Sequence, residues 1–429
     1  MNLKSNKAIT LIALIITIII LLILAGVSLS MVLGENGLIN KAQSSVNAYQ
    51  QAALNEQNLL QSIEDYMGNY GLPDNTPTTP AGTHVKPPAK WLGTIVDAVA
   101  DGKGNTFPVP KSFYYVGGDY TNGVIISDDP ADAYDGTTDK TTWEYTTSLV
   151  GNQFVWIPCT VDEYHKTNWG SSYVLGGYDS DDANASEIIQ IKKYNGFYVG
   201  RYEAGLANTI QEFLTNISNA SNSINNYNVE GIPQLKACKV PWTYIDYINS
   251  KNNAKNMYKN NLYVTSGLIT GAQWDVMLNK FIGTTNESGL TFTVDEMTNS
   301  DSWGNYMTNS IEYTGRLAQI VSGTFKPFGN ITTGKTKAYS NSSQASLNAD
   351  ILSTGASKIT EAYHIYDVAG NAWEWTDEIG QGSNTHIVRA SWGVGNGSGA
   401  NAPACRRDGR YLANNKDARL GFRVVLYIE

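Results

Sequence analysis

The feature that most constrains this chain is an uncharged apolar run near its N-terminus. Between Ala8 and Val32 almost every side chain is apolar and none is charged. Roughly 25 such residues are enough for a helix to cross a hydrocarbon core of about 30 Å. Lys4 and Lys7 precede the run and few basic residues follow it closely, which places the N-terminus in the cytoplasm. We therefore predict a membrane helix over residues 1–34 that displays the rest of the chain outside.

A cleaved secretory signal is the alternative to an anchor, because it also begins with a basic stretch. Such signals have an apolar core of about 7–15 residues and a small-residue cleavage site. The run in this chain is longer, and no Ala-x-Ala site follows it. We therefore favour the anchor.

A second helical pattern follows after the flexible point at Gly34 and Gly37. Its apolar side chains recur at steps of three and four, skipping one turn at Glu56, so they share one face of a helix. They are Ala42, Val46, Tyr49, Ala53, Leu60, Ile63 and Met67. We expect an amphipathic stalk helix over residues 35–69.

An apolar helix that runs into an amphipathic one resembles the stem of type IV pilins and pseudopilins. The residues Ala8-Ile9-Thr-Leu-Ile resemble a prepilin peptidase site, which implies processing between Ala8 and Ile9. In that family Gly usually precedes the cut, and an acidic residue stands where this chain has Ala13. The missing acid bears on filament assembly more than on anchoring, so a plain signal anchor with a stalk is the alternative. The resemblance implies the bacterial cytoplasmic membrane as location and pilin-like subunits as candidate partners.

The chain changes character after the stalk. Residues 70–90 contain Pro73, Pro77, Pro80, Pro87 and Pro88 without periodicity, which predicts a stiff, exposed linker. Residues 91–151 hold short aromatic or apolar runs, such as 112–116 and 123–126, between Gly, Asn and Asp turns. We expect a β-rich lead-in region there.

Composition excludes several classes of function. The net charge is −9 and the basic residues are scattered, so we expect no nucleic-acid partner. Three widely spaced cysteines without a Cys-x-x-Cys pair argue against a disulfide framework and a structural zinc site, although one disulfide stays open. Abundant Tyr and Trp with few charges is typical of ligand-contacting loops and also of ordinary strands, and composition does not decide between them.

Six segments of the C-terminal part follow one another in a recognisable order. They are 153–158 (QFVWIP), 196–203 (GFYVGRYE), 240–242 (VPW), 262–274 (LYVT to QW), 367–376 (DVAGNAWEWT), and 388–392 (VRASW) with 421–423 (GFR). This series resembles the formylglycine-generating enzyme (sulfatase-modifying factor) family, whose signature reads GNxWEW. The resemblance covers residues 152–429. It implies an α+β class, with the N-terminal helix followed by a loop-rich, C-type-lectin-like domain.

In that family the loop around the Trp-Glu-Trp segment holds a calcium ion. Carried over, Glu374 would give a carboxylate oxygen and Gly370 and Ala372 backbone oxygens, hard ligands that suit calcium. From the residues alone, Glu374 stands between Trp373 and Trp375 and needs a partner in such an apolar setting. Backbone N–H groups or an arginine are the alternative partners.

The family's oxidase activity depends on two cysteines shortly after the GGS[WY] strand, which bind copper as thiolates. Counted from Ser391, those places fall on Val394 and Gly399. Cys405 is nearby but alone, and we interpret it as a small buried hydrophobe. The resemblance therefore implies no copper, no catalytic residue and a non-enzymatic domain; an oxidase is the less favoured alternative.

A polar, aromatic stretch remains as a candidate binding surface. Gly, Asn, Ser, Asp, Arg and Tyr dominate residues 392–415 between strand-like flanks, which is how adaptable recognition loops are built. The residues expected to contact a ligand are Trp392, Asn396, Ser398, Asn401, Arg407, Asp408, Arg410, Tyr411, Asn414 and Asn415. The arrangement resembles variable proteins of diversity-generating retroelements, which implies a hypervariable segment here. An ordinary solvent loop is the alternative.

Together these observations predict a membrane-anchored, surface-displayed binding protein. Its partner would be an extracellular protein or glycan. The alternative function is that of a minor pilin or pseudopilin.

Overall fold

The computed structural model describes residues 79–177, 185–207, 229–321, 324–326, 328–339, 348–390 and 403–429, together with Ile16 and Ile18. The chain divides into two compact units, Met1–Thr76 and Pro77–Glu429. Ile16 and Ile18 are helical, whereas the rest of the predicted anchor, the stalk and the processing residues Ala8 and Ile9 lie outside the described residues. None of the helices in the described ranges is long and apolar enough to span a membrane.

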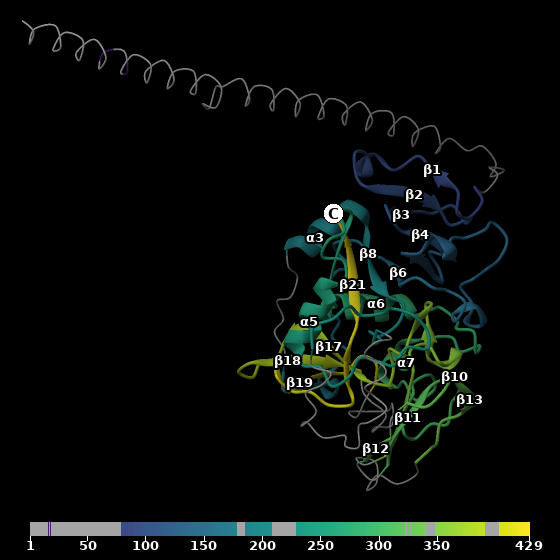
Figure 1. Ribbon diagram of the computed structural model, residues 1–429, viewed down its shortest axis with the longest axis vertical. Coiled ribbons are helices and arrows are strands. Elements are labelled where there is room, and N and C mark those ends of the chain that lie inside the picture. The colour runs from purple at the N-terminus through teal and green to yellow at the C-terminus, as the bar shows by residue number, and fades with distance from the viewer. Residues whose placement is uncertain are drawn as a thin grey trace, which may run out of the picture. The chain divides into compact units, whose positions relative to one another are not determined.

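A six-stranded antiparallel sheet forms the centre of the second unit, which we call the head (Figure 1). Its order is β4 (Tyr114–Asp119), β5 (Gly123–Ser127), β6 (Gln153–Pro158), β8 (Gly196–Gly200), β21 (Val424–Ile428) and β9 (Val264–Leu268). Successive side chains of a strand point to opposite faces, and β6 shows the result: Trp156 packs into one core cluster and Val155 into another. The sheet is therefore buried on both faces.

This sheet also joins the predicted lead-in region to the predicted lectin-like domain. β5 pairs with β6 along its length, with Ile125 opposite Val155 and Val124 opposite Trp156. The boundary expected at residue 151 therefore does not separate two folding units.

A second, mixed sheet lies against the first. Its order is β20 (Leu420–Phe422), β17 (Trp373–Ile379), β18 (Thr385–Arg389), β19 (Arg407–Leu412) and β7 (Val174–Leu175). β20 runs parallel to β17 and β7 runs parallel to β19, while β17, β18 and β19 are antiparallel neighbours. Figure 1 shows β17, β18 and β19 beside the helix α5 (Tyr247–Asn256).

Smaller elements complete the head. The remaining strands are β1 (His84–Val85), β2 (Val96–Ala100), β3 (Thr106–Pro110), β10 (Glu312–Gly315), β11 (Leu317–Val321), β12 (Thr324–Lys326), β13 (Thr332–Lys335), β14 (Ala349–Leu352), β15 (Glu361–Ala362) and β16 (Ile365–Tyr366). The other α-helices are α3 (Ala185–Tyr194), α6 (Gly271–Phe281) and α7 (Val294–Thr298). The described 3-10 turns are η1 (Ala89–Trp91), η2 (Pro130–Asp132), η3 (Trp143–Tyr145), η4 (Ser171–Tyr173) and η6 (Lys358–Thr360). The described part of the chain is thus a mixed α and β structure with more strand than helix.

The helix α6 is the most deeply buried helix described, and its start is set by its sequence. Thr270 and Gln273 form a capping box, in which each side chain bonds the other's backbone N–H. Trp274 and Phe281 then point into the core. This fixed helix carries Asp275, whose carboxylate organises the C-terminal strands described below.

Candidate functional site

Four buried charges connect α6 to the mixed sheet, and one of them is Arg407. Asp275 of α6 and Glu378 of β17 share both Arg389 of β18 and Arg407 of β19. The Nη1 of Arg389 lies 3.2 Å from Oε2 of Glu378, and the Nε of Arg407 lies 3.1 Å from its Oε1. All four side chains are at most 1% exposed. Arg407 therefore holds strands together and does not reach a ligand, which corrects the prediction for this residue.

Asp408 is also buried, contrary to its expected role as a surface contact. Its carboxylate receives the Nη2 of Arg410 at 2.6 Å and the Nη2 of Arg406 at 3.0 Å. Burial opposes ionisation, but the bonds from Arg410 and the charge of Arg406 lower the pKa of Asp408. The buried carboxylate of Asp408 thus positions the side chain of Arg410.

The remaining described residues among the predicted ligand contacts reach the surface. Arg410 and Asn414 are exposed, while Tyr411 and Asn415 are half-buried. Asn415 closes a turn, since its Oδ1 accepts the N–H of Leu412 at 2.7 Å. The predicted contacts Trp392, Asn396, Ser398 and Asn401 lie outside the described residues, as do Val394 and Gly399.

Tyr411 belongs to an aromatic surface that the sequence did not reveal. Its ring lies 5.2 Å from that of Trp373 and 6.2 Å from that of the buried Trp375. The guanidinium carbon of Arg419 lies 5.7 Å from the ring centre of Trp373. Trp373, Tyr411 and Arg419 are half-buried, so each offers surface to a partner. We call these three residues the aromatic platform.

The residues predicted to bind calcium do not fit that ion as they are placed. Both carboxylate oxygens of Glu374 accept hydrogen bonds from Arg423, at 2.9 Å and 2.6 Å. Gly370 (φ +73°) and Ala372 belong to a buried turn around Asn305, whose carbonyl accepts the N–H of Asn371. In the described ranges no three His, Cys, Asp or Glu side chains lie close enough to hold a metal ion. The partner of Glu374 is the arginine that the sequence left open as an alternative.

The three cysteines are free thiols, and none has the low pKa that thiolate chemistry needs. Burial raises the pKa of Cys405 to about 12, and it does the same for Cys159. The pKa of Cys238 is also raised by burial. Cys405 is fully buried, as expected of a small hydrophobe.

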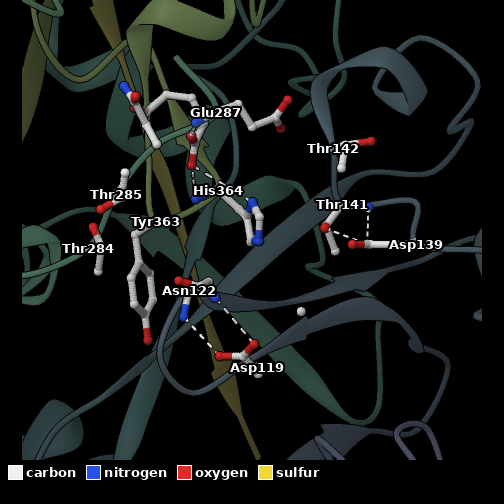
Figure 2. Close-up of a pocket in the computed structure, with 13 residues that line it drawn as sticks. Asp119, Asn122, Asp139, Thr141, Thr142, Thr284, Thr285, Glu287, Tyr363 and His364 are labelled. Atoms are coloured by element: carbon white, nitrogen blue, oxygen red, sulfur yellow. Dashed lines mark hydrogen bonds and ion pairs between the residues drawn. The ribbon is translucent and has the colours of Figure 1, made fainter. Parts of the chain in front are cut away.

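A polar cavity of about 250 Å³ lies beside the β15–β16 hairpin (Figure 2). Segments distant in sequence line it: the β4–β5 turn, the loop before η3, the loop after α6, and the hairpin tip. Four acidic side chains stand around it, namely Asp119, Asp139, Glu287 and Glu361. We call this cavity the hairpin pocket. No sequence pattern predicts it, because no two of its walls are neighbours along the chain.

The hairpin tip has an unfavourable backbone. Tyr363 and His364 have φ values of +56° and +60°, although such two-residue turns usually carry Asn-Gly. Left-handed conformations of bulky residues cost on the order of 1–3 kcal/mol each and often occur at functional sites. Arg201 holds the tip by donating its Nε to the His364 carbonyl at 3.2 Å, and Tyr363 donates its hydroxyl to the Tyr120 carbonyl at 2.7 Å.

The electrostatics of the hairpin pocket follow from burial. Desolvation raises the pKa of Glu361 to about 7, with the negative charge of Glu287 acting in the same direction. Desolvation and the charge of Arg201 lower the pKa of His364 to about 4, so this imidazole is neutral at pH 7. Burial also raises the pKa of Glu287.

Comparison of the chain with protein-family models and with curated proteins yields no match.

Proposed function

We propose that this chain is a surface-displayed ligand-binding protein. Its head would contain, over residues 152–429, a non-catalytic, C-type-lectin-like relative of the formylglycine-generating enzyme domain. An N-terminal helix in the bacterial cytoplasmic membrane would display it outside the cell. The apolar run over residues 8–32 supports the anchor, and the order of six family-like segments supports the relationship.

The aromatic platform is the observation that carries the binding function. Trp, Tyr and Arg are the residue types that dominate binding energy at protein interfaces, and here one of each meets on one partly exposed surface. Tyr411 offers a rigid, amphipathic ring whose ordering on binding costs little entropy. The strand that carries it is fixed by the Arg407 ion pairs, so the platform is preorganised.

The buried thiols support a head without oxidase chemistry. Copper binding and mixed-disulfide chemistry both require a thiolate with access to its partner. Cys405 is fully buried and its pKa is raised to about 12, which keeps the thiol protonated at neutral pH. The proposal therefore assigns the head to recognition.

Array screening of the full-length chain in lipid nanodiscs tests this function. Labelled chain is applied to arrays of glycans and of purified secreted proteins, together with Tyr411→Ala and the control Leu412→Ala. Leu412 is an exposed neighbour on the same strand that is not part of the platform. We expect a reproducible ligand whose affinity falls about tenfold or more in Tyr411→Ala, which corresponds to about 1.4 kcal/mol. An array without any ligand, or equal losses in both variants, would contradict the proposal.

A further inference from the structure

The hairpin pocket contains more negative than positive charge. Asp119 has a cationic partner, Lys103, at 2.8 Å. Glu287 and Asp139 accept hydrogen bonds from neutral donors instead: Glu287 from the Trp143 N–H at 2.7 Å, and Asp139 from the Thr141 N–H at 3.0 Å. The pocket therefore favours a cationic occupant.

The nearest buried cation does not neutralise these acids directly. Arg201 is fully buried, and each of its nitrogens donates to a neutral oxygen. These acceptors are the carbonyls of His364 and Thr141 and the side-chain oxygen of Gln153. Arg201 thus connects two walls of the pocket through hydrogen bonds. The carboxylates stay available to a cationic ligand.

Two polar atoms at the pocket wall lack a hydrogen-bond partner. The Nδ1 of His364 is buried and unbonded, at 3.8 Å from the Oε1 of Glu361, and the Oγ1 of Thr142 is likewise buried and unbonded. Figure 2 shows the His364 ring extending from the hairpin into the space between the other lining residues. Buried polar groups are rarely left unsatisfied, so an unbonded atom beside a cavity indicates a missing ligand or water. A neutral imidazole nitrogen and a hydroxyl both accept hydrogen bonds from an ammonium group.

The geometry distinguishes an organic cation from a metal ion. Among the described residues no three acids, histidines or cysteines converge on one point, as an inorganic ion would need. The acids surround a cavity of about 250 Å³ instead, which is slightly below the ~300–1,000 Å³ of typical ligand sites. The occupant must therefore be small.

We propose that the hairpin pocket binds a small organic ammonium ion that carries hydroxyl groups. The negative charges of Asp139, Glu287 and Glu361, which line the cavity without converging on one point, attract its ammonium group, and Thr142 bonds one of its hydroxyls. This site shares no residue with the aromatic platform, so its test is independent of the function proposed above.

Binding at this site is linked to proton release. Three groups face Glu361. They are the N–H and Nδ1 of His364 in the same hairpin, Glu287 in the loop after α6, and Arg201 at the end of β8. The charge of Lys358 lowers the pKa of Glu287, whereas the charges of Asp119 and Asp139 raise the pKa of His364. An ammonium ion favours the charged form of Glu361, so binding should release a proton near pH 7 and tighten between pH 6 and pH 8.

Isothermal titration of the full-length chain in nanodiscs with glucamine and with sorbitol tests the proposal, because the two polyols differ only in the amine. Glucamine should bind at least about tenfold more tightly than sorbitol. Measurement in buffers of different ionisation enthalpy should show proton release. Glu361→Gln and Asp139→Asn should each weaken glucamine binding about tenfold. The control Asp135→Asn removes the same charge from an exposed site in the same loop and should leave binding unchanged.

Equal binding of the two polyols would overturn the proposal, as would the absence of binding or equal losses in Asp139→Asn and Asp135→Asn. Asp139 is exposed, so its variant keeps the test decisive even if Glu361→Gln does not fold.

Discussion

Glu374 and Arg423 face each other as a bidentate ion pair in the interior of the head. The Oε2 of Glu374 lies 2.9 Å from Nε of Arg423 and its Oε1 lies 2.6 Å from Nη2, and both side chains are fully buried. Arg423 also donates to the carbonyls of Gly200 and Tyr366. The pair thus connects the mixed sheet, the central sheet and the β15–β16 hairpin.

Breaking this pair should destabilise the head strongly. Arg423→Met leaves a buried carboxylate without a partner, and we expect the free energy of unfolding to fall by about 3–5 kcal/mol. The double variant Glu374→Leu/Arg423→Met removes both charges and should recover part of that loss. Urea unfolding of the three proteins measures the effect. Calcium should not raise the unfolding midpoint; a rise that depends on Glu374 would restore the calcium site.

Glu203 should make stability depend on pH. Desolvation and the nearby carboxylates of Asp367 and Glu374 raise its pKa well above the ordinary value, and its Oε2 has no hydrogen-bond partner. A raised folded-state pKa means that the folded state binds more protons, so its stabilising contribution is lost as pH rises above about 4.5. Glu203→Gln should therefore gain stability relative to wild type from pH 5 to pH 8, by on the order of 1–3 kcal/mol. The exposed Glu144→Gln is the control, and parallel pH profiles would refute the assignment.

Two arginines three positions apart should behave differently. Arg407 is buried among Asp275 and Glu378, so Arg407→Ala should cost about 3–5 kcal/mol of stability. The side chain of Arg410 is 58% exposed, and Arg410→Ala should cost at most about 1 kcal/mol. Thermal and urea unfolding compare them. Similar losses in both variants would show that the buried network is not what fixes β19.

Cys405 should resist alkylation in the folded protein. Its thiol is buried, and its pKa of about 12 leaves little thiolate at pH 8. Cys238 is only half-buried, so iodoacetamide should modify it first. Mass spectrometry with and without denaturant gives the two rates. Fast modification of native Cys405 would reopen the oxidase alternative.

Sequence patterns predicted the core strands well because their signal is local. The apolar run at 153–158 forms β6, and the run at 123–126 lies within β5. The run at 112–116 begins as a strand only at Tyr114, because Ser112 adopts a left-handed conformation with φ +70°.

The site was harder to predict because burial of a polar residue depends on distant partners. Arg407 and Arg410 look alike in the sequence, but the acids that bury Arg407 lie on α6 and β17. The aromatic platform was hard to predict for the same reason. It brings together Trp373 and Tyr411, which lie on strands that are not neighbours in the chain.

Ligand binding to intact cells tests the central claim, that this chain displays a recognition head on the cell surface. Cells producing the full-length chain are incubated with the labelled ligand found on the arrays and are analysed by flow cytometry. Our account predicts surface binding that Tyr411→Ala reduces about tenfold and that Leu412→Ala leaves unchanged. Binding that appears only after the cells are permeabilised, or that is equal in both variants, would contradict it.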